Sequence, residues 1–320
     1  MYYDKEFKPY KIVDGQCVVA DESEWQKLFE LDKCTTCKTF DDCEANGGDC
    51  PKSPRPIVKV PTDIFEDVEG GVFDSEFRHL FDLESEAIRP RDLLTRFFQA
   101  VDSTPQVDYL IVTQRPEVVR ELYPIRSCDG YGNSKEGYGF VAFDRPNVIL
   151  ATYVETQADI KRLIPELLKC HDLCKGLAVV CNPKEELDFV SLDDGTAIWD
   201  FLEGEYEWKN GKECGHCESL DLIIAEGNEH PIHPQWLRSL RDQCKDVVPF
   251  HFAGWGRWEP LNGNGIPDKH DDSPEIEPFI WIGRDGQQSR SGCSPDRVMI
   301  EVGKEQSGRL LDGQEHNGRL

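Results

Sequence analysis

Short runs of β-branched residues alternate with segments of helical period along most of this chain, and this alternation restricts the fold more than any other feature. Six strand candidates lie at residues 56–61, 108–113, 147–154, 177–181, 221–226 and 248–254. Apolar residues recur at helical spacing in the segments between them, at 77–101, 116–122, 157–168 and 235–245. Strands separated by helices join through right-handed crossovers into a parallel sheet. Six such units predict an α/β fold, a partial (β/α) barrel with mostly parallel strands.

The helix expected after residue 154 has the strongest local signals. Thr156 and Asp159 have the spacing of a capping box, in which each side chain bonds the other residue's backbone N–H. The apolar positions that follow are spaced i, i+3, i+4, i+7 and i+8, which predicts an amphipathic helix with one buried face. These positions are Ile160, Leu163, Ile164, Leu167 and Leu168.

The chain divides into three parts by composition. Residues 1–55 form a cysteine-rich head, residues 56–258 carry the barrel pattern, and residues 259–320 form a C-terminal loop and tail. A polar insertion at about 185–217 interrupts the barrel pattern. A chain of 320 residues with 38% hydrophobic content can bury one large core, or one core with a small appendage.

The net charge of −25, from 61 acidic and 36 basic residues, limits the possible partners. Such a field repels nucleic acid from most of the surface, so extended nucleic-acid contact is disfavoured. Solubility is the simplest explanation of the charge, and a role as a DNA mimic or in binding a basic protein is the alternative. No run of eighteen apolar residues and no signal-peptide pattern occurs, so we expect a cytoplasmic protein without a membrane segment.

Four cysteines crowd the head in the pattern C-x2-C-x5-C-x6-C: Cys34, Cys37, Cys43 and Cys50. The chain has thirteen cysteines, an odd number, and no export signal, which argues against a secreted disulfide framework. Clustered thiolates suit a tetrahedral zinc ion or an iron–sulfur cluster. The spacing alone does not choose between these two.

A second cysteine pair lies in the insertion, in the sequence Cys214-Gly215-His216-Cys217. The letters match the active-site motif of disulfide isomerases, but that motif opens a helix, whereas here a strand is expected to follow. Half of a zinc site is the favoured interpretation, completed from the head or by Cys170 and Cys174. Two unconnected thiols are the alternative.

Polar residues follow the expected strands at their carboxyl ends, where parallel β/α folds collect functional groups. They are Asp63, Gln114 with Arg115, Glu155, Asn182, Glu226 with Asn228, and His251 with Trp255. Asp63 and Glu155 could bind a metal, a hydroxyl or an amine, and Arg115 suits a carboxylate or phosphate. A polar residue at a strand end is also a common helix cap or loop anchor.

The most recognisable text lies in the C-terminal third. It comprises HPQWLRSLRDQCKDVVPFHFAGWGRWEP from His233 and VGKEQSGRLLDGQEHN from Val302, with weaker matches upstream in VPTDIFEDV, YLIVTQRPE and NVILATYVETQ. From about residue 57 to the end, the chain resembles a bacteriophage-associated, radical-SAM-like family of uncharacterised proteins. The resemblance implies a partial barrel that holds an iron–sulfur cluster and is suspected of S-adenosylmethionine radical chemistry, in the host cytoplasm if the chain is phage-encoded.

The chain departs from the family pattern at several strand ends. The head cysteines have a different spacing, so the family's three cluster ligands do not transfer one by one. Asn182 and Asn228 stand where the pattern has carboxylates, and Gln114 and Ala253 stand where it has lysines. An amide keeps a hydrogen bond but cannot ionise, so metal affinity and general-base capacity are lost at these positions.

Two residues near these departures have their own expected roles. Glu229, together with Glu226, could compensate for the missing carboxylates by position. His233, before a proline at a helix start, is better explained as a loop anchor than as a ligand.

The leading hypothesis is a phage-encoded radical-SAM-like iron–sulfur enzyme. Cys34, Cys37 and Cys43 would hold the cluster, with Cys50 as the alternative member, and Asn182 would help to bind the cofactor. Catalytic roles fall to the strand-end residues Asp63, Arg115, Glu155, Glu226 and Asn228.

The second hypothesis is a non-catalytic barrel scaffold stabilised by zinc, whose acidic surface binds a host or phage protein. Cys34, Cys37, Cys43, Cys50, Cys214 and Cys217 are the candidate zinc ligands. Metal-dependent hydrolysis and thiol redox chemistry remain as lesser alternatives.

Overall fold

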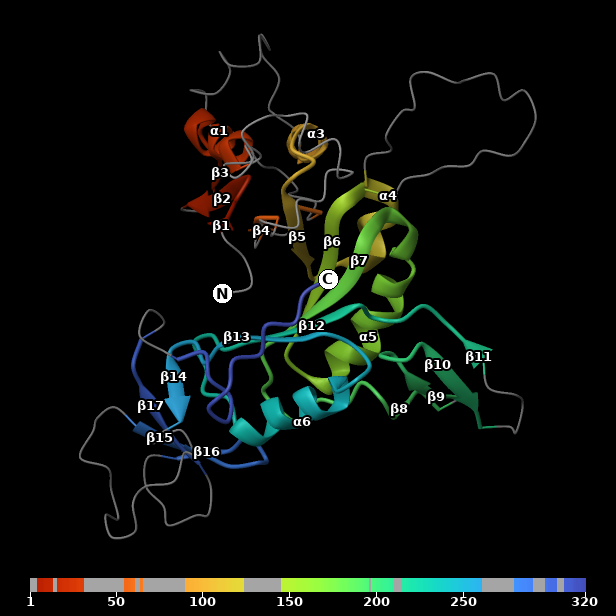
Figure 1. Ribbon diagram of the computed structural model, residues 1–320, viewed down its shortest axis with the longest axis vertical. Helices are drawn as coiled ribbons and strands as arrows, with labels where there is room; N and C mark the ends of the chain where they lie inside the picture. The colour runs from red at the N-terminus through yellow and green to blue at the C-terminus, as the bar shows by residue number, and fades with distance from the viewer. Residues whose placement is uncertain are drawn as a thin grey trace. The chain divides into compact units, whose positions relative to one another are not determined.

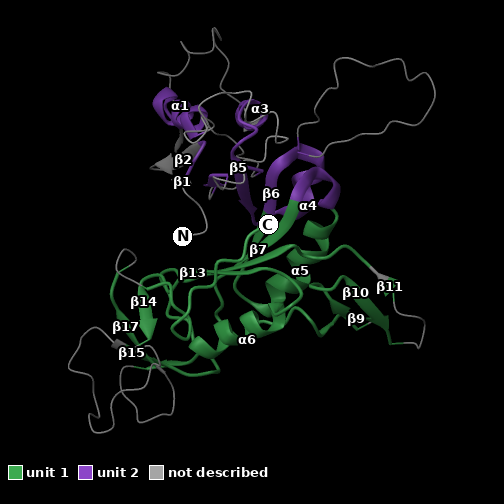
Figure 2. Ribbon diagram, viewed as in Figure 1, with its two compact units in different colours: residues 1–2, 151–169, 176–320 green, residues 3–150, 170–175 purple. Residues whose placement is uncertain are grey.

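The computed structural model forms two compact units (Figure 2). Unit 1 comprises residues 1–2, 151–169 and 176–320, and unit 2 comprises residues 3–150 and 170–175. The structure describes residues 5–13, 16–31, 55–60, 64–65, 90–123, 145–195, 197–209, 215–260, 279–289, 297–303 and 308–320.

The central sheet has the strand order β1-β4-β5-β6-β7-β12-β13 (Figure 1). Its members are β1 (Lys5–Glu6), β4 (Ile57–Val60), β5 (Asp108–Thr113), β6 (Arg145–Val154), β7 (Cys174–Cys181), β12 (Leu222–Glu226) and β13 (Phe250–Gly254). The pairs β1–β4, β4–β5, β7–β12 and β12–β13 are parallel. The predicted α/β class and the partial (β/α) barrel of mostly parallel strands are confirmed, and each of the six predicted strands is present.

Unit 2 contains the helices α1 (Glu22–Leu31), α3 (Pro90–Ser103) and α4 (Pro116–Leu122), and the antiparallel pair β2 (Tyr10–Val13) and β3 (Gln16–Val19). Its core is largely aromatic. Phe97 packs edge-on against Phe98 and Tyr109, with ring centroids 5.3 and 5.8 Å apart, and Phe98 lies 4.6 Å from Tyr123. The short 3-10 helix His171–Leu173 precedes β7.

A buried arginine occupies this aromatic core. The side chain of Arg145 is 4% exposed and forms two hydrogen bonds with Asp102, of 2.9 and 3.2 Å. Its guanidinium also lies over the rings of Phe98 and Tyr123, at 4.5 and 4.9 Å from their centroids. The paired carboxylate and the ring faces compensate for burying this charge.

In unit 1, the helix α5 (Gln157–Leu168) begins with the predicted capping box. Thr156 accepts a hydrogen bond from the Asp159 backbone N–H, and the Asp159 side chain accepts one from the Thr156 backbone N–H. All five apolar positions predicted for this helix are buried. The helix α6 (Pro234–Cys244) forms where the helical pattern at 235–245 predicts one, and it buries Trp236, Leu240 and Cys244.

Two small antiparallel sheets complete unit 1. The insertion forms β8 (Leu192–Asp193), β9 (Ala197–Asp200), β10 (Glu205–Trp208) and β11 (Gly215–His216), in the order β11-β10-β9-β8. The C-terminal region forms β14 (Trp258–Pro260), β15 (Phe279–Ile282), β16 (Gln288–Ser289) and β17 (Arg297–Glu301), in the order β14-β17-β15-β16. In the part of the chain that the structure describes, no helix is long and apolar enough to cross a membrane.

The C-terminal tail is tied to α6 and to the end of β13. Asp312 accepts hydrogen bonds from Arg238, at 2.8 Å, and from Arg241, at 2.7 Å. The Trp255 indole N–H donates to the Leu310 carbonyl at 3.0 Å. These contacts therefore join the two most recognisable C-terminal motifs to each other within unit 1.

Candidate functional site

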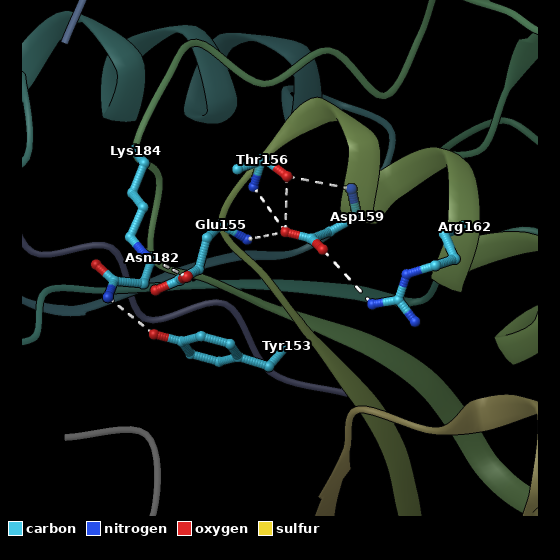
Figure 3. Close-up of polar contacts among 7 residues, drawn as sticks. All are labelled: Tyr153, Glu155, Thr156, Asp159, Arg162, Asn182 and Lys184. Atoms are coloured by element: carbon cyan, nitrogen blue, oxygen red, sulfur yellow. Dashed lines mark hydrogen bonds and ion pairs between the residues drawn. The ribbon is translucent and has the colours of Figure 1, made fainter.

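Glu155 immediately follows β6 in the loop that leads into α5. The loop is held by Asp159, whose Oδ2 accepts hydrogen bonds from the backbone N–H groups of Glu155 and Thr156, at 3.2 and 3.0 Å (Figure 3). The Glu155 carboxylate forms an ion pair with Lys184, with 2.5 Å between Oε2 and Nζ. The backbones of the same two residues are joined by a 2.9 Å hydrogen bond from Lys184 N–H to the Glu155 carbonyl. The capping box thus fixes the strand end that presents Glu155.

Asn182 follows β7 and lies beside the end of β6. Its backbone N–H donates to the Val154 carbonyl at 3.0 Å, and its side-chain Nδ2 donates to the Tyr153 hydroxyl at 2.8 Å (Figure 3). The residue is 1% exposed. Among the described residues, no donor reaches its Oδ1, which is fully buried. A buried amide oxygen without a donor is uncommon in folded proteins, because it costs free energy.

Glu226 is the last residue of β12, and Asn228, in the loop that follows, forms a side-chain hydrogen bond with Tyr153. The backbone makes an unusually close approach here, since a Cβ on Gly227 would lie 1.9 Å from the Trp255 carbonyl oxygen. Gly256 has φ +77°, and a Cβ there would lie 2.3 Å from the Gly227 carbonyl carbon and 2.4 Å from the Asn228 nitrogen. These two glycines allow the loops after β12 and β13 to lie backbone to backbone.

The Tyr153 hydroxyl is the centre of this cluster. Burial and the negative charges of Glu155 and Glu226 raise the pKa of Tyr153 to about 12, although hydrogen bonds with Asn182 and Asn228 oppose the rise. The phenol is therefore protonated at neutral pH. We call Tyr153, Glu155, Asn182, Glu226 and Asn228 the strand-end cluster.

The strand-end cluster is rich in acceptors. Two carboxylates and the Asn182 oxygen can accept hydrogen bonds from amino or hydroxyl groups of a ligand, and the phenol can donate one. Glu155 and Glu226 are the groups in the cluster that could act as a general base, since the amides cannot take up a proton. The arrangement suits binding and orienting a polar small molecule.

A family model of proteins of unknown function, DUF5131, matches residues 75–319. The chain belongs to this family. No curated protein and no solved structure matches it. Four residues of the strand-end cluster were predicted, and all five lie inside the DUF5131 match, whereas Asp63 and the head cysteines precede it.

The other predicted site residues have different surroundings. Arg115 belongs to unit 2, where its Nε lies 3.5 Å from Glu117. Asp63 lies outside the described residues. Trp255 is buried and bonds the C-terminal tail. Glu229 forms an exposed ion pair with Arg257 at 3.0 Å, and its role as a substitute for the missing carboxylates stays a prediction.

Two histidines near the strand ends have structural contacts. His233 is buried, and its Nδ1 accepts a hydrogen bond from the Gln235 backbone N–H at 3.1 Å, so its interpretation as a loop anchor at the start of α6 is confirmed. His251 is buried within β13, with Nε2 3.5 Å from Arg309. Burial and the charge of Arg309 lower the pKa of His251 to about 3.

Of the predicted cysteine ligands, only Cys217 lies in the part of the chain that the structure describes; Cys34, Cys37, Cys43, Cys50 and Cys214 lie outside it. Cys217 is a half-buried thiol, and burial raises its pKa, with further contributions from Glu218 and Asp200. The thiols of Cys170 and Cys174 are buried and donate to backbone carbonyls. Within the described ranges, no group of three or more His, Cys, Asp or Glu residues is arranged to hold a metal ion.

Two residues of the site escaped the sequence analysis. Tyr153 lies inside a strand rather than after it, and its role follows from alternation, because it shares a strand face with Glu155 two residues later. Lys184 lies two residues beyond Asn182, in a loop that carries no motif. The polar positions can be predicted from the sequence, but which of their side chains contact one another cannot.

Proposed function

We propose that this DUF5131 protein is a radical-SAM-like enzyme whose strand-end cluster binds a polar cosubstrate. The observation that carries the proposal is Asn182, a buried amide whose oxygen meets no donor among the described residues. Burying this oxygen without a donor costs free energy that no described hydrogen bond offsets, and such positions are often retained for function. A ligand that donates a hydrogen bond to the Asn182 Oδ1 would offset this free energy cost.

The residues of the strand-end cluster have different roles in ligand binding. Glu226 and Glu155 supply negative charge toward an amino group, and Lys184 holds the Glu155 carboxylate in place. Tyr153, kept protonated by its raised pKa, accepts a hydrogen bond from Asn182 Nδ2 and can donate its own O–H.

The proposed cofactor is an iron–sulfur cluster held by Cys34, Cys37 and Cys43, with Cys50 as the alternative ligand. These thiolates would hold the cluster, and the cluster would supply a binding position for S-adenosylmethionine and one-electron chemistry. The hydrogen-bond acceptors of the strand-end cluster suit the amino and hydroxyl groups of a polar cosubstrate.

A second candidate function is the zinc-stabilised scaffold that binds a protein partner. One observation favours it. The amides Asn182 and Asn228 occupy two of the strand ends, and their side chains contact Tyr153, so these positions hold neutral groups that cannot ligate a metal as carboxylates do. Zinc would then replace the cluster at the head cysteines.

Binding of S-adenosylmethionine to protein purified without oxygen tests the enzyme proposal. We expect Asn182→Leu and Glu226→Gln each to weaken binding at least about tenfold, or about 1.4 kcal/mol. The matched control is Glu166→Gln, which removes a carboxylate from the exposed side of α5, where it pairs with Lys169. Equal weakening in the control, or no binding to cluster-loaded protein, would contradict the proposal.

A further inference from the structure

Two arginines near the end of the chain differ from the others in their surroundings. Among the arginines whose side chains the structure describes, all except Arg309 and Arg319 form an ion pair with a carboxylate. The chain has 61 acidic residues, so a carboxylate is available to most of its cations. Both exceptions act on the same residue, His251 of β13, so the unpaired positive charge is concentrated at one place in unit 1.

The C-terminal tail holds Arg309 against β13. Backbone hydrogen bonds of 2.9 and 3.0 Å join residues 316–318 to this strand, around an antiparallel bridge between His251 and Asn317. The Arg309 guanidinium lies beside His251, with 3.5 Å between its Nη2 and the histidine Nε2. The same Nη2 donates a hydrogen bond to Asn317 Oδ1 at 2.9 Å. The position of Arg309 is therefore fixed by the pairing of the tail with the strand.

The contacts of Arg309 do not neutralise its charge. The Asn317 oxygen is uncharged, and the His251 imidazole is neutral at pH 7, because burial and the charges of the two arginines lower its pKa to about 3. The carboxylate of Glu315 accepts a hydrogen bond from the Asn317 amide instead. The Arg309 Nε–H is fully buried, and among the described residues no acceptor reaches it. A guanidinium N–H buried in this way costs free energy, which an anionic partner would offset.

We propose that Arg309, Arg319 and His251 form a binding site for a phosphate or carboxylate group of a small-molecule ligand. A guanidinium pairs with either anion through parallel N–H donors, and charge-assisted hydrogen bonds of this kind are strong. Arg319 supplies a second positive charge, and the neutral imidazole of His251 can donate a hydrogen bond from one ring nitrogen. The anion takes the place of the carboxylate partner that the other described arginines have.

The charge of the whole chain favours a small ligand over a polyanion. A net charge of −25 repels nucleic acid, whose many phosphates extend beyond the two arginines, whereas a single anionic group meets the local positive charge. His251 pairs with Ile224 of β12, two residues before Glu226, so the anion site lies on the strands that lead to the strand-end cluster. It uses none of the residues of that cluster, so it goes beyond the proposed enzyme and is tested separately.

Isothermal titration calorimetry of the full chain tests the anion site, with inorganic phosphate and acetate as separate probes at constant ionic strength. Calorimetry is preferred to a thermal shift, because phosphate also stabilises proteins by its exclusion from their surface. We expect saturable binding, and the anion that binds more tightly identifies the group that the site takes. Arg309→Gln and Arg319→Gln should each weaken this binding at least about tenfold.

The matched control is Arg284→Gln, which removes the same charge from an exposed arginine of unit 1 that pairs with Glu186, and it should bind both anions as the unmodified chain does. Equal weakening in this control would overturn the proposal, because binding would then respond to net charge alone. Unchanged binding in the variants of Arg309 and Arg319, or no saturable binding of either anion to the unmodified chain, would also overturn it. If Arg309→Gln does not fold, Arg319→Gln decides the result, because its side chain is exposed. These outcomes do not depend on cluster content, so they are distinguishable from failure of the proposed enzyme.

Discussion

Replacing Asn182 with leucine should stabilise the fold while it removes ligand binding. Leucine has nearly the shape of asparagine, so the change removes the polar groups without opening a large cavity. The side-chain hydrogen bond to Tyr153 is lost, which costs about 0.5–1.5 kcal/mol. The buried Oδ1, which meets no donor among the described residues, is also removed, and this recovers about 1–3 kcal/mol.

The net expectation is a gain of about 1 kcal/mol in the free energy of unfolding. For a chain of 320 residues, that raises Tm by about 1–2 °C. Differential scanning calorimetry at pH 7 measures the change, with the ratio of calorimetric to van't Hoff enthalpy showing whether the two units unfold together. A variant that gains stability and loses binding is the signature of a residue kept for function.

Asn147 provides the matched control, because it is also a buried amide, 5% exposed, at the start of β6. Its Nδ2 donates to the carbonyls of Val101 and Thr104 at 3.0 and 3.3 Å. Asn147→Leu breaks two hydrogen bonds and should lower the free energy of unfolding by about 1–3 kcal/mol. If Asn182→Leu lowered Tm as much as Asn147→Leu does, Asn182 would be a structural amide and the reasoning would be refuted.

Three further predictions concern charged and titratable groups. Asp102→Ala leaves the Arg145 guanidinium buried without its carboxylate, so the free energy of unfolding, measured by urea titration, should fall by about 3 kcal/mol; a change below 1 kcal/mol would contradict this. Hydrogen bonds from Arg238 and Arg241 of α6 lower the pKa of Asp312, so its carboxylate stabilises the fold at pH values above its unfolded pKa. This contribution is lost as pH falls through the folded pKa. The Tm difference between the unmodified chain and Asp312→Asn should therefore be smaller at pH 3 than at pH 7. His251 binds a proton below about pH 6.5 in the unfolded chain but only near pH 3 in the folded chain, so the free energy of unfolding should decrease as pH falls from 6.5 to 3, by up to about 1.4 kcal/mol per pH unit. His251→Gln should flatten this pH dependence. An unchanged slope would show that other groups cause the acid lability.

The regular elements were predictable because they depend on local signals. The capping box at Thr156 and the five apolar positions after it fix α5 almost without reference to the rest of the chain. The strand Asp108–Thr113 and the helix Pro116–Leu122 have the bounds that their sequence patterns indicate. Burial and periodicity act over a few residues, and a single sequence contains that information.

The site was predictable in part, for a physical reason. The strand-end rule selects Glu155, Asn182 and Glu226, because the carboxyl ends of parallel strands meet at one edge. It also selects Trp255, whose indole binds the tail, and it misses Tyr153, whose side chain reaches the cluster from within β6. Which polar groups face one another depends on twist and side-chain direction across strands far apart in sequence, and no local pattern encodes it.

The C-terminal motifs show that a recognisable sequence motif does not by itself identify a functional site. Their recognisability suggests function, yet His233 caps α6, and Asp312 binds two arginines of that helix. Each contact joins segments separated by many residues along the chain, so a fixed choice of residue types is needed at both ends. A motif can therefore be distinctive because it stabilises a fold.

Metal and acid-labile sulfide analysis, with a visible spectrum of protein purified without oxygen, tests the central proposal most directly. The account predicts brown protein with about four irons and four sulfides per chain, and a broad absorption that dithionite bleaches. Replacing Cys34, Cys37 and Cys43 together should remove both metal and colour. Colourless protein that contains zinc and no sulfide would contradict the iron–sulfur enzyme and leave the zinc-stabilised scaffold as the function to test.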